Sequence, residues 1–473
     1  MLTNQFQPGG EIEKSIDGDY STIYHSPWNG ETSFPVTLEY FFGTDEKTID
    51  YAVLYPRRDG GTNGIILNFT VYFKTEGDVD YRVMNTYEYS ESTAPRIISF
   101  PEGIEDPTAI KLVVTKGMGD FASLAEIEFY NEENLSEDLD IFRDKSATEL
   151  KPEVTINDIE NIENIFIKNM AEAMFNHTYS EFRTGTFQSY PNPNIIATRN
   201  KTGTYGIYDN VTGIYVKSYA DMVVFAGDFD GEIFLRVVDH TKGFTGVDFP
   251  IRPGINKFPT NGEEGLAYLI FQDDQEKEVS LNFATGEVNG YFDIEKHTEA
   301  DWQDLLDNTT YQFFDVLGKY SHLTFTTPAF QQYTDKPIEL IELYDEIVEL
   351  EQEFLGLYKY NRENTSRMYF RVNVHQDMYM FATSYRTEYS KSTLSSIANS
   401  AILRSSPWGP AHEVGHINQT RPGLKWLGLT EVTTNIYSLY VQKALGNESR
   451  IDIEELENYT NRYEKAFTEI LAA

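Results

Sequence analysis

Residues 407–431 read PWGPAHEVGHINQTRPGLKWLGLTE, and they contain the motif His412-Glu413-Val414-Gly415-His416. On an α-helix, residues at positions i and i+4 lie on the same face, so the imidazoles of His412 and His416 can reach one metal ion. Glu413 lies beside that face, where its carboxylate can act as a general base towards water. The motif therefore predicts a helix that carries a catalytic metal site.

The residues around the motif predict where this helix ends and where the next one begins. Pro410 favours a helix start, and Gly423 favours a helix stop. Fourteen residues separate His416 from Glu431. Thr430, a favourable N-cap residue, predicts a second helix that opens there, so Glu431 in its first turn can return as a third ligand. Two imidazoles and one carboxylate leave the fourth position of Zn²⁺ open for water, as in catalytic sites.

The predicted chemistry is metal-assisted hydrolysis. Zn²⁺ would lower the pKa of water towards ~7 and polarise the scissile carbonyl, while Glu413 takes the proton and passes it to the leaving amine. Asn435, one helical turn after Glu431, is predicted to orient that ligand or a neighbouring histidine, the alternative being an ordinary surface asparagine. The alternative to a metal site is that His412 and His416 are two ordinary surface histidines. A chance match to the motif somewhere in the chain has odds of about one in a hundred. Tyr379 and Tyr385 are weak candidates for stabilising the oxyanion.

Two segments, Trp408-Gly-Pro-Ala-His-Glu-Val-Gly-His and Trp426-Leu-Gly-Leu-Thr-Glu-Val-Thr-Thr-Asn-Ile-Tyr, resemble the enhancin-like metallopeptidases, peptidase family M-60. The resemblance covers roughly residues 150–473 and implies a gluzincin domain. It implies that Zn²⁺ is held by His412, His416 and Glu431, with Glu413 as the base, and that substrates are mucins and other O-glycosylated proteins. Only 42 residues follow Glu431 in this chain. Because the resemblance leads us to expect more helical structure there, we expect a C-terminally truncated catalytic domain.

Residues 1–131 predict an antiparallel β-sandwich, because short alternating runs such as 36–41 and 49–55 are separated by turn signals. Within this part, Asp17-Gly-Asp19 followed by Thr22 places oxygen ligands in a tight turn. Such a donor set suits Ca²⁺, and Glu126 is a possible partner acid. A plain Asp-Gly turn without a cation is the alternative.

Together with Pro-Arg-Arg-Asp-Gly-Gly-Thr-Asn-Gly at 56–64, this part resembles the discoidin or coagulation-factor type C domain over about residues 6–131. It is most similar to the family 32 carbohydrate-binding modules. The resemblance implies a galactose-binding-like jelly roll with a structural Ca²⁺ held by Asp17, Asp19, Thr22, Glu126 and a carbonyl near Lys14. It also implies a site for galactose-type glycans formed by His25, Trp28, Arg57, Arg58 and Asn63. An aromatic ring can stack on a sugar while cationic and amide groups bind its hydroxyls. The alternatives are a module without lectin activity and a core position for Trp28.

Along the chain, these observations predict a multidomain α+β protein. The expected parts are a carbohydrate-binding module at 1–131, a linker and helix at 132–178, a second β-sandwich at 179–293, and a mainly helical catalytic domain at 294–473. Apolar periodicity predicts helices over 153–176, 298–320 and 337–361.

Composition excludes several classes of function. The 473 residues include 38 Lys and Arg against 75 Asp and Glu, a formal net charge of −37. This charge argues against nucleic acid and anionic lipid as main partners. The chain has no Cys, which excludes disulfides, thiolate metal sites and a cysteine nucleophile. No apolar run has the length of a transmembrane helix, and the first residues do not resemble a signal peptide.

The prediction for the whole chain is therefore a zinc endopeptidase that cuts O-glycosylated, mucin-like proteins and is held on them by its carbohydrate-binding module. Because such substrates are extracellular, we expect a secreted or surface-anchored bacterial protein whose leader is absent from this chain. Two alternatives stay open. One is a glycan-binding adhesin with an inactive peptidase domain, and the other is a zinc peptidase that does not depend on glycans.

Overall fold

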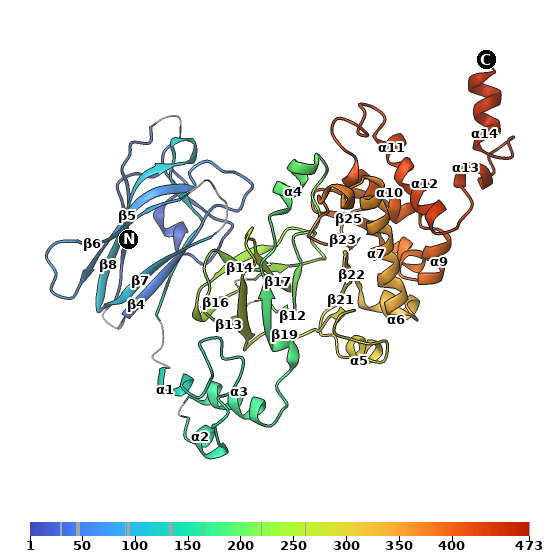
Figure 1. Ribbon diagram of the computed structural model, residues 1–473. Coiled ribbons are helices and arrows are strands. Elements are labelled where there is room, and N and C mark those ends of the chain that lie inside the picture. Colours follow the sequence, from blue (N-terminus) through green and yellow to red (C-terminus); the bar gives the residue numbers. More distant parts are fainter. Residues whose placement is uncertain are drawn as a thin grey trace. The chain divides into compact units, whose positions relative to one another are not determined.

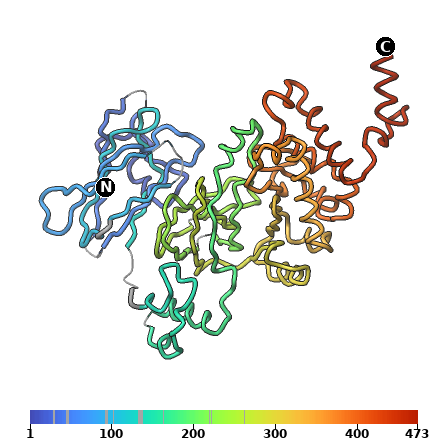
Figure 2. Tube along the Cα trace, viewed as in Figure 1, coloured from blue at the N-terminus to red at the C-terminus, as the bar shows by residue number. Residues whose placement is uncertain are grey.

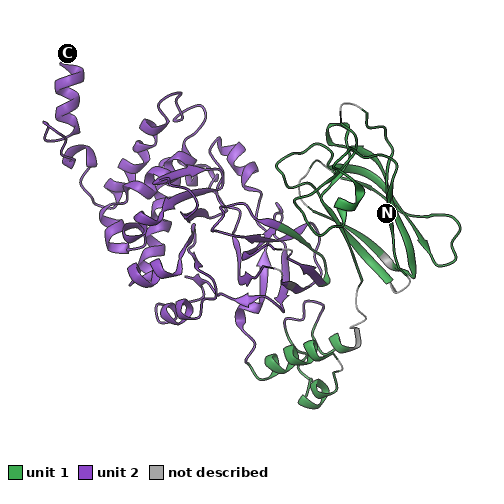
Figure 3. Cartoon of the chain, turned by 180° about the vertical axis from the view of Figure 1, so that it is seen from behind, with its two compact units in different colours: residues 1–143, 149–177, 248–255 green, residues 144–148, 178–247, 256–473 purple. Residues whose placement is uncertain are grey.

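The computed structural model describes residues 1–28, 31–43, 48–89, 91, 95–131, 136–162, 164–218, 220–260 and 262–472 (Figures 1 and 2). The chain forms two compact units (Figure 3). Unit 1 comprises residues 1–143, 149–177 and 248–255, and unit 2 comprises residues 144–148, 178–247 and 256–473. The boundaries expected from the sequence stay predictions, and residues 132–135 and 163 of the expected linker and helix lie outside the described residues.

Unit 1 contains the β-sandwich that the sequence predicts. One sheet has the strand order β1-β3-β8-β5-β6, the other has the order β10-β4-β7, and β2 pairs with β9. In β3, the alternating residues Val36, Leu38 and Tyr40 are buried, because successive side chains of a strand point to opposite faces. The strands are β1 (Leu2–Thr3), β2 (Tyr24–His25), β3 (Val36–Phe41), β4 (Thr48–Tyr55), β5 (Ile66–Thr75), β6 (Arg82–Glu88), β7 (Arg96–Glu105), β8 (Pro107–Gly117), β9 (Ser123–Leu124) and β10 (Glu126–Tyr130).

The helical part of unit 1 differs from the sequence prediction. Instead of one helix over 153–176, the structure has α2 (Ile156–Glu160) and α3 (Ile165–Phe175), preceded by α1 (Ser136–Leu139). The side chain of Asn164 accepts hydrogen bonds from the backbone N–H groups of Phe166 and Ile167, which starts a new helix at this point. Ile165 is therefore not on a continuous apolar face, and it is 66% exposed.

Unit 2 opens with two antiparallel sheets that fit the predicted second sandwich. One has the order β11-β18-β13-β16, and the other contains β14-β17-β12-β19. All residues of β17 are buried, as expected for a central strand. The elements are β11 (Thr184–Gln188), α4 (Pro193–Asn200), β12 (Asn210–Val216), β13 (Asp221–Ala226), β14 (Ile233–Val238), β16 (Gly254–Pro259), β17 (Gly265–Phe271), β18 (Glu278–Phe283) and β19 (Glu287–Val288), while most of β15 (Val247–Ile251) falls in unit 1.

The remainder of unit 2 combines a six-stranded sheet with helices. The sheet has the order β20-β21-β22-β23-β25-β24, and β24 forms its antiparallel edge. The strands are β20 (Phe292–Asp293), β21 (Phe313–Leu317), β22 (Ser321–Thr326), β23 (Met368–Asn373), β24 (Met380–Thr383) and β25 (Arg386–Ser390). The helices are α5 (Trp302–Asp307), α6 (Thr327–Tyr333), α7 (Pro337–Phe354), α8 (Leu394–Ile397), α9 (Ser400–Ser405), α10 (Trp408–Asn418), α11 (Thr430–Thr433), α12 (Asn435–Ala444), α13 (Arg450–Ile453) and α14 (Arg462–Lys465).

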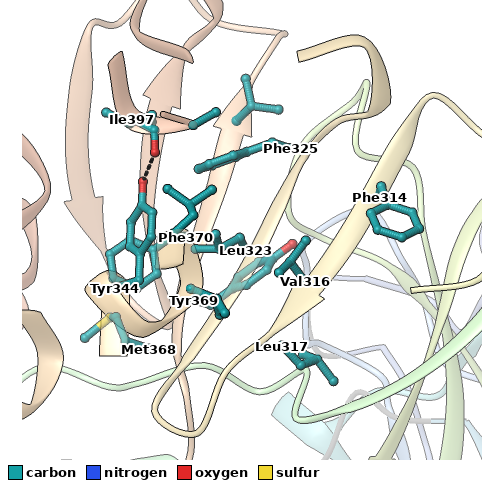
Figure 4. Close-up of a cluster of buried hydrophobic side chains, with 14 of the residues drawn as sticks. Phe314, Val316, Leu317, Leu323, Phe325, Tyr344, Met368, Tyr369, Phe370 and Ile397 are labelled. Atoms are coloured by element: carbon teal, nitrogen blue, oxygen red, sulfur yellow. Dashed lines mark hydrogen bonds between the residues drawn. The ribbon is translucent and has the colours of Figure 1, made fainter. Parts of the chain in front are cut away.

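One apolar core joins this sheet to α7 (Figure 4). Phe325 and Phe370 of the sheet and Tyr344 of α7 are fully buried in it. The hydroxyl of Tyr344 donates a hydrogen bond of 2.9 Å to the carbonyl of Ile397, which satisfies the polar end of a core side chain. Helix α7 confirms the amphipathic helix predicted from residue 337, but it ends at Phe354 and not at residue 361. No helix among the described residues has the length and apolar character needed to span a membrane.

The predicted helix over 298–320 is wrong beyond Asp307. Helix α5 ends there, and residues 313–317 form β21, in which every residue is buried. A short apolar run is ambiguous between a helix and a buried strand, and here pairing with β22 decides the outcome. Residues 294–473, where a mainly helical catalytic domain was expected, are thus built around a sheet that the sequence analysis did not predict.

Candidate metal centre

Helix α10 carries the His-Glu-x-x-His motif, and its packing against α12 depends on Gly415. A Cβ atom at this position would lie 2.6 Å from Thr434 Oγ1 and 3.0 Å from Tyr437 Cβ. Glycine permits this close approach because it has no side chain. The hydroxyl of Thr434 also donates a 2.6 Å hydrogen bond to the carbonyl of His412. The two helices are therefore held together at the level of the motif.

The three predicted metal ligands come together in space. Ligand atoms of His412, His416 and Glu431 lie within 4.8 Å of one another, and no other described residues form such a group of three. Glu431 Oε2 is 3.1 Å from His412 Nε2 and 3.2 Å from His416 Nε2. Two imidazole nitrogens and one carboxylate are the donor set that Zn²⁺ takes in catalytic sites, so these residues fit the ion.

Asn435 contacts both sides of the centre. Its Oδ1 lies 2.8 Å from His412 Nδ1, and its Nδ2 donates a 2.9 Å hydrogen bond to the backbone carbonyl of Glu431. Because an amide oxygen only accepts, Nδ1 of His412 carries the proton and Nε2 keeps its lone pair for a metal. The side chain of Asn435 thus orients His412 by contact with its ring, and it orients Glu431 by a hydrogen bond to the backbone carbonyl of Glu431.

Sequence reasoning missed Gln419. Its Oε1 is 3.4 Å from His416 Nδ1, and its Nε2 donates hydrogen bonds of 2.7 Å to the carbonyl of Thr430 and 2.8 Å to Thr433 Oγ1. This side chain therefore joins the end of α10 to the helical turn that contains Glu431. Its spacing of three residues from His416, which places helical residues near one another, is the signal that could have identified it.

Glu413 is the buried acid of the site. It is 6% exposed, and its Oε2 has no hydrogen-bond partner among the described residues. Burial, followed by the neighbouring carboxylate of Glu431, raises the pKa of Glu413 to about 8. A carboxyl group beside the metal ligands can accept a proton from water and later donate it, as a general acid–base catalyst must.

A cleft of about 510 Å³ opens beside these residues. Glu413, His416 and Glu431 line it together with residues 380–384, which include the edge strand β24. An edge strand presents unpaired backbone groups that can bind an extended chain. Tyr379 and Tyr385 are not among the described residues that line this cleft, and the hydroxyl of Tyr385 donates to Asn194 Oδ1 at 3.0 Å.

The acidic turn of unit 1 brings several predicted calcium ligands together. Thr22 Oγ1 donates to Asp17 Oδ2 at 2.8 Å, and the backbone N–H of Gly18 donates to Glu126 Oε2 at 3.2 Å. Burial, and then neighbouring carboxylates, raise the pKa of Glu126 to about 8. Asp19 instead accepts hydrogen bonds within its own turn. Among the described residues, these three acids do not form a group within 4.8 Å, and the Ca²⁺ site stays a prediction.

Four of the five predicted sugar-binding residues lie near one another. The rings of His25 and Trp28 are 5.0 Å apart, and Arg57 Nη1 donates a 2.9 Å hydrogen bond to the carbonyl of Asn63. Burial is the main cause that lowers the pKa of His25, and the charge of Arg57 adds to it. Trp28 is 48% exposed, which excludes a core position. Arg58 lies elsewhere, with its guanidinium 4.3 Å from the ring centroid of a buried tyrosine.

Two family models match parts of the sequence. Residues 287–469 match the family model described as peptidase M60, enhancin and enhancin-like. This segment is therefore similar to peptidase M60 domains. Residues 3–127 match the F5/8 type C domain. Both resemblances inferred from the sequence are thereby confirmed, and the M60 domain contains the six-stranded sheet and the converging ligands.

Solved structures resemble the M60 domain and its surroundings. A metallopeptidase from Bacteroides thetaiotaomicron is 25% identical over 68% of this chain and 57% of its own, with a TM-score of 0.61. A metallopeptidase in complex with Tn antigen is 26% identical over 57% of this chain and 53% of its own, with a TM-score of 0.53.

A Clostridium perfringens structure with two CBM32 modules and an M60 catalytic domain covers 94% of this chain and 50% of its own. Its identity of 19% and TM-score of 0.53 show a shared fold. The chain spans less than two thirds of the length of each of these structures. A comparison with curated proteins finds no match.

Proposed function

We propose that this chain is a zinc endopeptidase that hydrolyses peptide bonds in O-glycosylated, mucin-like proteins outside the cell. The proposal rests on one observation: His412, His416 and Glu431 converge on one point, and the buried Glu413 lies beside them in a cleft. The M60 domain and the metallopeptidases that it resembles support a peptidase.

The residues of the site have separable roles in this reaction. His412, His416 and Glu431 hold the ion, while Asn435 and Gln419 fix the orientation of the two imidazoles. When bound, Zn²⁺ would supply Lewis-acid chemistry to the scissile carbonyl and to water. Glu413 takes a proton from the attacking water and delivers it to the nitrogen of the leaving amine.

The edge strand β24 offers a way to position the substrate. Residues 380–384 line the cleft, and β24 pairs with β25 on one side only. An extended peptide can add to this edge as a further strand, with main-chain hydrogen bonds that place the scissile bond over the metal centre. Such binding selects for an unfolded, extended substrate, which heavily O-glycosylated segments provide.

Two observations favour a glycosylated substrate. One of the similar metallopeptidases is solved in complex with Tn antigen, an O-linked glycan. The F5/8 type C domain groups an exposed Trp28 with His25, Arg57 and Asn63, a combination that suits a galactose-type sugar. A module that binds glycan raises the local concentration of the peptidase on its substrate.

Mass spectrometry of fragments from one defined O-glycoprotein tests the proposal. We expect cleavage that stops with a metal chelator and returns when Zn²⁺ is added. Absence of cleavage in both glycosylated and deglycosylated substrate would instead favour the glycan-binding adhesin. Equal cleavage rates for the two substrates would keep the peptidase but remove its dependence on glycans.

A further inference from the structure

The catalytic cleft has positive charge on one rim that the proposed hydrolysis does not use. Arg421 and Lys425 both lie in the loop between His416 and Glu431, and both line the cleft. Among the described residues that line the cleft, these two are the Lys and Arg residues. In a chain with a net charge of −37, a pair of cations beside the metal centre is a distinctive local feature.

The backbone that carries these cations is anchored to residues 201–203, of which Gly203 lines the cleft. The N–H of Arg421 donates a 2.9 Å hydrogen bond to the carbonyl of Lys201, and the N–H of Gly203 donates a 2.6 Å bond to the carbonyl of Ile417. Gly203 permits this contact because a Cβ there would lie 3.1 Å from the same carbonyl oxygen. Within the loop, the N–H of Lys425 bonds to the carbonyl of residue 420 at 3.0 Å. The rim is therefore held in a defined position.

The two charged groups form no ion pair with an acidic side chain in the described part of the chain. No side-chain hydrogen bond involves Arg421 or Lys425 there either, although 75 acidic residues are present in the sequence. Burial, and then the nearby charge of Arg421, lower the pKa of Lys425, while the carboxylate of Glu431 acts weakly in the opposite direction. Two neighbouring cations without a paired counterion gain free energy when an anion binds between them.

We propose that Arg421 and Lys425 form a subsite beside the metal centre that binds a carboxylate of the substrate. The inference rests on the proposed peptidase function and adds a preference for acidic substrates to it. Arginine binds a carboxylate through two parallel N–H···O bonds, while lysine adds a point charge. The carboxylate can belong to an Asp or Glu side chain near the scissile bond or to an acidic sugar of the O-linked glycan.

Local placement of these cations matters because the whole molecule repels acidic substrates. At physiological ionic strength, screening confines this repulsion to a distance of about 8 Å. Within the cleft, the nearest fixed charges therefore determine which substrates bind. Near the scissile bond, an acidic group of the substrate is therefore attracted by Arg421 and Lys425 more strongly than it is repelled by the net negative charge of the protein.

The test uses the full chain loaded with Zn²⁺ and three synthetic glycopeptides with one cleavage site. The first has a neutral glycan and neutral flanking residues, the second has a Glu near the cleavage site, and the third has a glycan ending in sialic acid. We expect kcat/KM to be higher for at least one acidic substrate. Arg421→Gln and Lys425→Met should each lower kcat/KM for that substrate about tenfold and leave the neutral substrate almost unchanged.

A matched control and a binding measurement complete the experiment. Lys359→Met removes an exposed cation that does not line the cleft, and it should leave all three kcat/KM values unchanged. In a Glu413→Gln background, calorimetry should show weaker binding of the acidic glycopeptide when Arg421 or Lys425 is replaced. A loss confined to the Glu-containing peptide assigns the subsite to the polypeptide, and a loss confined to the sialylated one assigns it to the glycan.

Failure of the subsite is distinguishable from failure of the peptidase. If none of the three glycopeptides is cleaved by the wild-type chain, the proposed function is rejected. If all three are cleaved and the two cation variants lose activity equally on each, or lose none, the acidic subsite is overturned while the peptidase stands.

Discussion

Gly415→Ala tests whether the contact between α10 and α12 sets the geometry of the metal centre. Alanine is about 1 kcal/mol more favourable than glycine in an unobstructed helix. Here the added Cβ would lie 2.6 Å from Thr434 Oγ1 and 3.0 Å from Tyr437 Cβ, so α12 must shift. Because overpacking of this kind costs about 1–3 kcal/mol, we expect a net loss of about 1 kcal/mol in the free energy of unfolding. Since α12 directly follows the turn with Glu431, Zn²⁺ affinity should also fall about tenfold.

Urea unfolding and competition with a metal indicator measure the two effects. Gly409→Ala is the matched control, because it lies in the same helix but its added Cβ meets the flexible end of Met380, 2.7 Å from Sδ. That variant should be as stable as the wild type or slightly more stable. If Gly415→Ala is as stable as this control and binds Zn²⁺ equally well, close packing of α12 does not determine the position of the third ligand.

Four further predictions concern single side chains. Glu413→Gln should keep its Zn²⁺ but lose turnover at least about a hundredfold, because water has lost its base, and normal turnover would reject the assigned role. Asn435→Ala should lower Zn²⁺ affinity about 10–100-fold with little change in urea midpoint, and an unchanged affinity would show that its contact with His412 is incidental. His25→Ala should abolish retention on a galactose column without altering the circular dichroism spectrum, and full retention would place the sugar site elsewhere. Glu351 is fully buried, and burial raises its pKa well above its ordinary value of 4.5. The native state therefore keeps a proton that the unfolded chain loses, so stability falls by up to about 1.4 kcal/mol per pH unit as pH rises above 4.5. Glu351→Gln should remove this contribution to the pH dependence of the free energy of unfolding. If the variant and the wild type show the same slope of unfolding free energy against pH between pH 4.5 and 8, the prediction is wrong.

Local periodicity accounts for the parts of the fold that were predicted correctly. The apolar positions of α7 and the alternation in β3 depend on residues close in sequence, and both elements have the expected form. The failures occurred where a local pattern has two solutions. Residues 313–317 fit a helix or a buried strand equally well, and only their pairing with β22 makes them a strand. The break before α3 depends on a single cap, Asn164, within an otherwise continuous apolar pattern.

In the metal centre too, some features follow from local sequence and others follow only from tertiary contacts. The sequence by itself determined that two imidazoles share one helical face with an acid beside them, because a helix repeats every 3.6 residues whatever surrounds it. It also determined that fourteen residues lie between His416 and Glu431, but not the path of that segment. Tertiary structure alone decided that Glu431 returns to the histidines, because α12 packs on the bare surface of Gly415 and Gln419 bonds to the turn at Thr430. Contacts between distant residues depend on the packing of the whole unit, which no local pattern encodes.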